Sequence, residues 1–193
     1  MKSSIFYILT IAAIFTFFGT SADAQRRDYL TDEEIEIIRD AQEIDLRIAV
    51  LVHAIDRRLA VLKINVGNTE KELKEKDIWG PLPTGSKIEL LSDVKRIFQK
   101  AIDDIDNLAA RPDSAVIYDT DGKKPKVPKD LFNKAVRTLA AAATRYRPVF
   151  EKELSLTEVK TEKGAYMDLI ENCSQVIEAV TKLPAEAKKS KNK

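Results

Sequence analysis

Four stretches of this 193-residue chain repeat apolar residues every three or four positions. That spacing puts the apolar side chains along one side of an α-helix, so each stretch predicts an amphipathic helix. The chain has only six glycines and seven prolines, which favours helices further. The sequence therefore predicts an all-α protein, with four helices in a bundle. We expect up-down-up-down order, although two long connections leave room for a crossover.

The first stretch predicts one continuous helix of about eight turns. Thr31 can cap its first amides, and Glu34 can return the bond to the backbone of Thr31. Gly67–Asn68 is a plausible stop. Its apolar stripe consists of Ile38, Ala41, Ile44, Ile48, Leu51, Ile55, Leu59 and Leu62.

The connection from Asn68 to Ser86 is long, and its second half contains two prolines that exclude a helix there. We expect Trp79 and Leu82 in this connection to fold back over the end of the bundle, because large apolar groups gain most from burial. The second helix is predicted to begin at Ser86, where Glu89 completes another capping box, and to end at Arg111–Pro112.

The third helix is predicted to begin near Pro128, since a proline is tolerated in the first turn. We expect Pro148, near its end, to kink this helix or begin its final turn. A break at 154–157 separates it from a fourth helix, which runs from about Glu158 to Lys182. Between the second and third helices, 112–128 is irregular, with an acidic turn at 119–122.

The first 24 residues have the order of a secretory signal peptide. Lys2 precedes an apolar run from Ile5 to Phe18, and a small-x-small site follows at Ala22–Ala24. This run is shorter than the roughly 20 residues of a membrane-spanning helix, although an uncleaved anchor is the alternative. We predict one helical domain over 25–184 and a disordered, lysine-rich tail over 185–193.

Charge and cysteine content narrow the class of protein. The formal net charge is +1, which gives the domain no general attraction to nucleic acid. Cys173 is the single cysteine, so an exported form has no internal disulfide and is held together by packing. Because Cys173 lies at an apolar position of the fourth predicted helix, we expect a buried, unreactive thiol.

Few residues suit a cofactor or a metal. His53 and Met167 are the candidate axial ligands for a non-covalent haem, and one cysteine excludes covalent haem attachment. We favour a simpler arrangement in which His53 is hydrogen-bonded to Asp56 one turn further on. The spacing of Asp103 and Asp106 suits a weak cation site, but nearby basic residues can balance them instead. The sequence contains neither a complete zinc or di-iron ligand set nor a full calcium loop, so we expect no resident cofactor or metal.

No catalytic motif is recognisable, and no catalytic residue is assigned. The sequence therefore predicts an exported, non-enzymatic helical protein, secreted or periplasmic, that binds or scaffolds another macromolecule or a component of the cell envelope. Two alternatives stay open. One is a haem or metal carrier using His53 with Met167, and the other is an enzyme whose site the sequence does not reveal.

Overall fold

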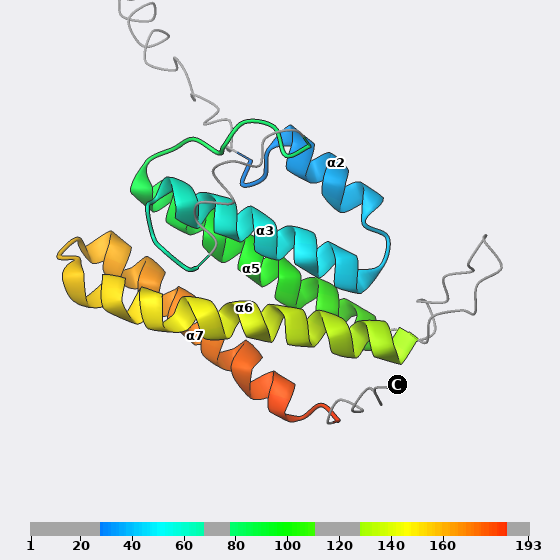
Figure 1. The fold of residues 1–193 in the computed structure, drawn as a ribbon. Helices are drawn as coiled ribbons and strands as arrows, with labels where there is room; N and C mark the ends of the chain where they lie inside the picture. Colours follow the sequence, from blue (N-terminus) through cyan, green and yellow to red (C-terminus); the bar gives the residue numbers. More distant parts are fainter. Residues whose placement is uncertain (1–27, 68–77, 111–127, 185–193) are drawn as a thin grey trace, which may run out of the picture.

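The computed structural model describes residues 28–67, 78–110 and 128–184. Within these ranges the chain is all-helical, with five α-helices and no β-strand (Figure 1). None of these helices combines the length and the apolarity needed to cross a bilayer. The helices are α2 (Asp32–Asp40), α3 (Ile44–Val61), α5 (Lys87–Ala110), α6 (Pro128–Leu156) and α7 (Lys160–Thr181).

Several sequence predictions lie outside the described residues. They are the signal peptide at 1–24, the start of the domain at 25–27, the first part of the long connection at 68–77, the irregular segment at 111–127 with its acidic turn, and the tail at 185–193.

The prediction of one long first helix is wrong, and this is why five helices are present rather than four. The chain leaves helical geometry at Ala41, whose ψ is 80°, and α3 begins at Ile44. The side chain of Arg47 stabilises the bend, because its Nε donates to the carbonyl oxygen of Ala41 at 3.1 Å. The apolar period continues through the bend, so spacing alone did not reveal it. Folding back lets α2 cover α3, where a straight helix would have carried its first turns into solvent.

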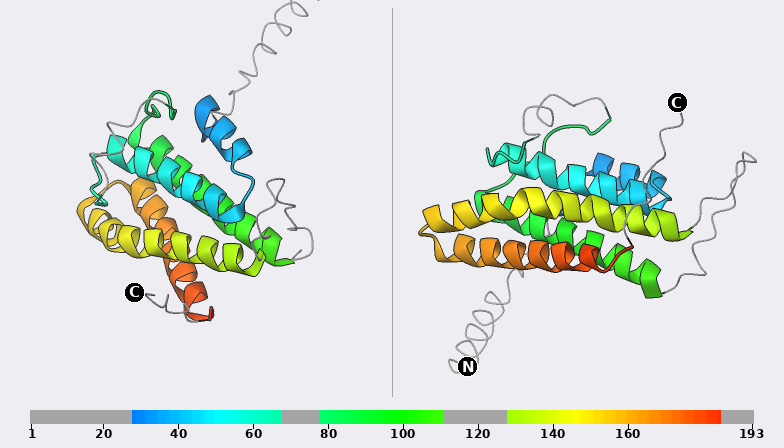
Figure 2. Two further views of the ribbon diagram at one scale, coloured as in Figure 1. Left: turned by 45° about the vertical axis from the view of Figure 1, so that its right-hand side comes forward. Right: turned by 60° about the horizontal axis from the view of Figure 1, so that its bottom comes forward.

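The four longer helices form two antiparallel pairs, α3 with α5 and α6 with α7 (Figures 1 and 2). The pairs stack so that α3 also packs against α6, and α5 also packs against α7. Consequently α3 and α7 lie diagonally opposite each other. The four helices alternate in direction along the chain, as an up-down-up-down order requires, but the first and the last of them are not neighbours as they are in the simplest bundle of that kind.

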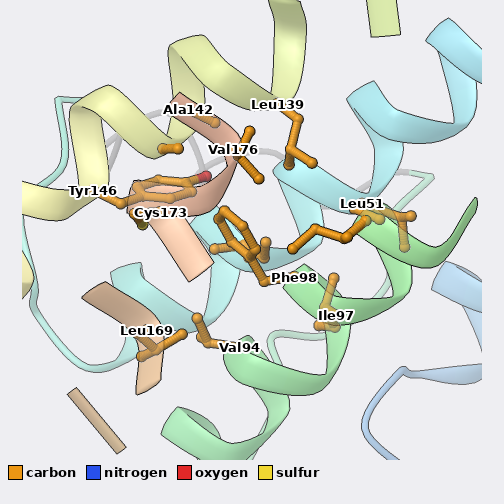
Figure 3. Packing of buried hydrophobic residues seen from close by; sticks show 14 of the residues in the cluster. Leu51, Val94, Ile97, Phe98, Leu139, Ala142, Tyr146, Leu169, Cys173 and Val176 are labelled. Atoms are coloured by element: carbon orange, nitrogen blue, oxygen red, sulfur yellow. The ribbon is translucent and has the colours of Figure 1, made fainter. Parts of the chain in front are cut away.

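The core lies between the two pairs and contains aliphatic side chains from every long helix (Figure 3). A row of aromatic rings runs through it, with centroid separations of 5.9 to 6.4 Å, within the range of favourable ring contacts. The members of this row are Phe98, Tyr146, Phe150 and Tyr166. Leu51 and Cys173 are both fully buried in the same core, which confirms their predicted inward positions.

Two of the predicted helix boundaries can be compared directly with the structure. The capping pair at the start of α5 forms, because the backbone nitrogen of Ser86 donates to Glu89 at 2.7 Å. Pro148 lies inside α6 rather than in its final turn, and the helix continues to Leu156. Pro148 faces solvent, whereas Phe150, two residues further on, is fully buried. We attribute the continuation of α6 to this apolar contact, which compensates for the missing backbone hydrogen bond.

Candidate functional site

Four ionisable side chains from three helices meet beneath α2. We call them the Glu34 cluster: Glu34 of α2, Arg57 and Arg58 of α3, and Asp93 of α5. Glu34 and Arg57 are 0% exposed, and Arg58 is 1% exposed. Charged groups are almost never buried to this extent unless they are paired, so their partners decide what the cluster does.

Glu34 is the acceptor at the centre of the cluster. Its Oε1 accepts from Nη1 of Arg57 at 2.7 Å and from Nη1 of Arg58 at 2.9 Å, and its Oε2 accepts from Nη2 of Arg58 at 2.8 Å. Oε2 also accepts from the backbone nitrogen of Thr31 at 3.0 Å, so the predicted capping box is present. Asp93 lies 3.9 Å from Nε of Arg58 and balances the second positive charge.

The Nη2 atoms of both arginines also donate to backbone carbonyls of two separate segments. Nη2 of Arg57 donates to the carbonyl oxygens of Gly80 and Pro81 at 3.1 and 2.6 Å. Nη2 of Arg58 donates to the carbonyl oxygen of Tyr29 at 2.6 Å. The cluster thus fastens the segment before α2 and the connection after residue 78 to α3. It is closed to solvent and its charges are balanced, so its chemistry suits anchoring.

Trp79 covers one side of this anchor. It is 7% exposed, which confirms the expectation that it folds back onto the helices. Its ring lies 3.9 Å from the ring of His53, between centroids, and the guanidinium carbon of Arg57 lies 5.8 Å from the indole centroid. His53 is half-buried at this contact.

The connection after residue 78 approaches α2 closely at Gly80. This glycine has a φ of +61°, and a Cβ at this position would lie 2.5 Å from Cδ of Glu33. The positive φ favours glycine at this position, and a larger residue would also have to displace the side chain of Glu33. Leu82, further along the connection, is half-buried.

A second polar group joins α3 to α6. Oδ1 of Asp56 accepts from the hydroxyl of Tyr146 at 2.6 Å, and Oδ2 accepts from Nη2 of Arg145 at 2.8 Å. Nη1 of Arg145 also donates to the carbonyl oxygen of Val66 at 3.1 Å. Burial, together with the charge of Asp56, raises the pKa of Tyr146 well above its usual value. Both carboxylate oxygens of Asp56 thus bind side chains of α6.

The structure does not bring the two candidate haem ligands together. Met167 lies on α7 and is 60% exposed, whereas His53 lies on α3 against Trp79. The helices α5 and α6 lie between α3 and α7. Across the described part of the chain, no group of three or more His, Cys, Asp or Glu side chains is arranged to hold a metal ion.

Asp103 and Asp106, the candidate cation ligands on α5, face solvent. Oδ1 of Asp103 accepts from the side-chain amide of Gln99 at 2.9 Å. Lys100, which we expected to balance Asp103 and Asp106, pairs instead with Asp104 at 3.2 Å. Cys173 is a poor nucleophile, because burial raises the pKa of its thiol to about 12.

The sequence did not reveal a group of exposed apolar side chains at one end of the molecule. We call it the apolar end, and its members are Ile88 at the start of α5, Leu156 at the end of α6, Val159 before α7, and Met167 in α7. They are 39% to 66% exposed. Figure 1 shows the start of α5 and the turn between α6 and α7 at the same end of the helices.

An ion pair ties this end together. Nζ of Lys87 lies 2.9 Å from Oε2 of Glu162, which also accepts from the hydroxyl of Thr157 at 2.6 Å. The hydrogen bond with Glu162 raises the pKa of Lys87, and the same bond lowers the pKa of Glu162. The first turns of α5 and α7 are therefore held side by side, next to the turn that carries Leu156 and Val159.

Within the described residues, fold and site together define an all-helical domain whose buried charges anchor its own segments and which carries exposed apolar side chains on the helices that meet at one end. Comparisons of the chain with protein-family models, with curated proteins and with solved structures found no match.

Proposed function

We propose that this chain is an exported, non-enzymatic binding protein that docks a protein of the cell envelope onto its apolar end. In this proposal α3, α5, α6 and α7 serve as a rigid four-helix bundle, and α2 is a strap across it. The location is the periplasm or the cell exterior, as the first 24 residues indicate.

The apolar end is the observation that carries this proposal. Of the six large apolar residues that are exposed in the described ranges, four belong to it. Covering the remaining surface of each such side chain is worth roughly 1 kcal/mol, because full burial is worth about 1.5–3 kcal/mol. Single exposed apolar residues are normal, whereas several in one region are typical of an interaction surface.

The surroundings of the apolar end also suit a docking surface. Lys163 and Glu158 form an ion pair at 3.2 Å beside Val159, with side chains 41% and 90% exposed. Such a pair adds little to the stability of the free protein, but it provides polar groups at the edge of an apolar centre. An apolar centre with a polar rim is the usual composition of a protein–protein interface.

The proposal is tested by capture from a native envelope fraction with the purified chain. The double variant Leu156→Lys with Val159→Lys places charge at the apolar end, and Leu46→Lys is the matched control because Leu46 is also exposed but lies at the start of α3. We expect wild type and control to retain the same envelope protein in stoichiometric amount, and the double variant to lose it while its melting curve stays unchanged. Equal retention by the double variant would overturn the proposal.

Export is tested separately. We expect the full chain to be recovered outside the cytoplasm with its N-terminus cleaved after Ala24, as determined by fractionation and N-terminal sequencing. Recovery of an uncleaved chain in the cytoplasm would remove the localisation from the proposal and leave the docking surface to be judged by capture.

A further inference from the structure

A pocket opens at the opposite end of the molecule from the apolar end. It has a volume of about 140 Å³ and lies where the later turns of α5 and α7 meet the first turns of α6. Figure 1 shows α6 and α7 separating as they run away from their shared turn.

The walls of the pocket are apolar on all three helices. Ile102 and Ile105 of α5 and Phe132 and Val136 of α6 face it, together with Val176 of α7. An enclosed apolar cavity of about 150 Å³ binds benzene, and this pocket has a similar volume but is partly open to solvent. The size and lining of this pocket therefore match an apolar group of about six carbon atoms.

The chain after α7 partly closes the pocket. Leu183 contributes to the lining, and its backbone nitrogen donates to the carbonyl oxygen of Val180 at 3.1 Å. The next residue, Pro184, is tethered to α6 because its carbonyl oxygen accepts from Nη2 of Arg137. The pocket is thus formed by residues that are held in place.

The polar side chains in the lining give the site a chemical preference. They are Asp106 of α5 and Gln175 of α7, both exposed to solvent. A carboxylate at the edge of an apolar pocket favours a ligand that places a cation or a hydrogen-bond donor there, and it repels an anion.

From this geometry we infer that the pocket binds a small amphipathic amine, with its ring or branched alkyl group against the aliphatic walls and its ammonium group beside Asp106. The site is independent of the proposed docking surface, because it uses the other end of the helices. Gln175 can accept a second hydrogen bond from the ammonium group through its side-chain carbonyl.

The experiment uses benzylamine as the probe and benzoate as a control ligand of matched ring size but opposite charge. Binding is measured by titration with NMR detection of the pocket methyl groups. We expect benzylamine to bind saturably with a Kd on the order of 1 mM, since it has few atoms to contribute. Benzoate should bind at least tenfold more weakly because its carboxylate faces Asp106.

Two variants locate the site. Ala179→Leu adds a larger side chain to the lining and should abolish benzylamine binding, whereas Ala141→Leu on the exposed side of α6 should leave it unchanged. Asp106→Asn keeps the shape and should remove the preference for benzylamine over benzoate. An absence of saturable binding by the wild type up to about 10 mM, tenfold above the expected Kd, would overturn the inference. So would equal affinity for the two ligands, or unchanged binding in Ala179→Leu.

Discussion

Replacing Glu34 by glutamine tests whether the Glu34 cluster holds α2 in place. The substitution preserves the size of the side chain and removes one negative charge. The cluster contains two carboxylates and two guanidinium groups, so the variant leaves one buried positive charge without a partner. The new amide NH₂ also places a donor where a guanidinium group donates, which removes at least one hydrogen bond.

The magnitude follows from the contacts of Glu34. Its carboxylate accepts three guanidinium hydrogen bonds of 2.7 to 2.9 Å at a site with no solvent exposure. Removing one partner of a buried ion pair costs about 3–5 kcal/mol, and we expect the lower end because glutamine keeps one acceptor. About 3 kcal/mol is a large share of the roughly 5–15 kcal/mol by which domains are stable. It corresponds to a fall in Tm of roughly 6–12 °C for a domain of this size.

Urea unfolding followed by circular dichroism measures this loss, and Glu36→Gln is the matched control. Glu36 lies in the same helix and pairs with Arg39 at 2.6 Å, but the two side chains are 61% and 65% exposed. The control should therefore change the free energy of unfolding by no more than about 0.5 kcal/mol. If Glu34→Gln is no more destabilising than Glu36→Gln, the cluster does not anchor α2.

Fluorescence gives a second readout, because Trp79 is the single tryptophan and lies beside Arg57. In Glu34→Gln the guanidinium groups lose their common acceptor, and the connection that Arg57 holds through Gly80 and Pro81 should loosen. We expect the emission of Trp79 to shift to the red at urea concentrations where the helical signal is still intact. Coincident changes in the two signals would mean that the connection and the helices unfold as one unit.

Three further predictions concern the core. Leu51→Asp should unfold the domain, because Leu51 is 0% exposed and the new carboxylate would have no partner. Thermal melts followed by far-ultraviolet circular dichroism measure this, and a melt that barely differs from that of the wild type would contradict the assigned helix face. Tyr146→Phe should lower the free energy of unfolding by about 1.5–3 kcal/mol in urea, since it removes a buried hydrogen bond to the charged Asp56; a loss below about 0.5 kcal/mol would contradict this. Because the pKa of the Cys173 thiol is about 12 in the folded chain against an ordinary 9.0, the unfolded thiol ionises first as pH rises. The thiol's contribution to stability should therefore be fully present below pH 9.0 and fall above it by about 1.4 kcal/mol per pH unit. Cys173→Ala should show a shallower alkaline loss in urea titrations, and equal slopes would refute the assignment.

Much of the helical content could be predicted from the apolar spacing and from the capping residues of the sequence. The stripe around Leu51 lies inward, and the pairs Thr31–Glu34 and Ser86–Glu89 both form hydrogen bonds at helix starts. The break at 41–43 could not be predicted in the same way. Apolar residues keep the helical period on both sides of it, and the bend is stabilised by Arg47, which acts from six residues away.

The buried cluster was hidden for a different reason. In sequence, Arg57 and Arg58 form an isolated basic pair, which is ordinarily exposed. In the structure every residue from 54 to 60 is buried, so this part of α3 is enclosed on all sides. The acceptor for both arginines is Glu34, more than 20 residues earlier in the chain, and it reaches them only because α2 folds back. The ion pairs of Glu34 with the two arginines therefore depend on the bend between α2 and α3, which the apolar spacing does not predict.

Capping and anchoring by the same glutamate explain why α2 occupies one position on α3. Apolar contacts alone leave a short amphipathic helix free to slide by a turn, since each turn presents a similar stripe. Glu34 removes that freedom, because its two oxygens satisfy Arg57, Arg58 and the backbone of Thr31 in a single register. A buried ion pair often adds less stability than apolar residues of the same volume. The cluster is therefore better understood as fixing the position of α2 and of the Trp79 connection than as a source of net stability.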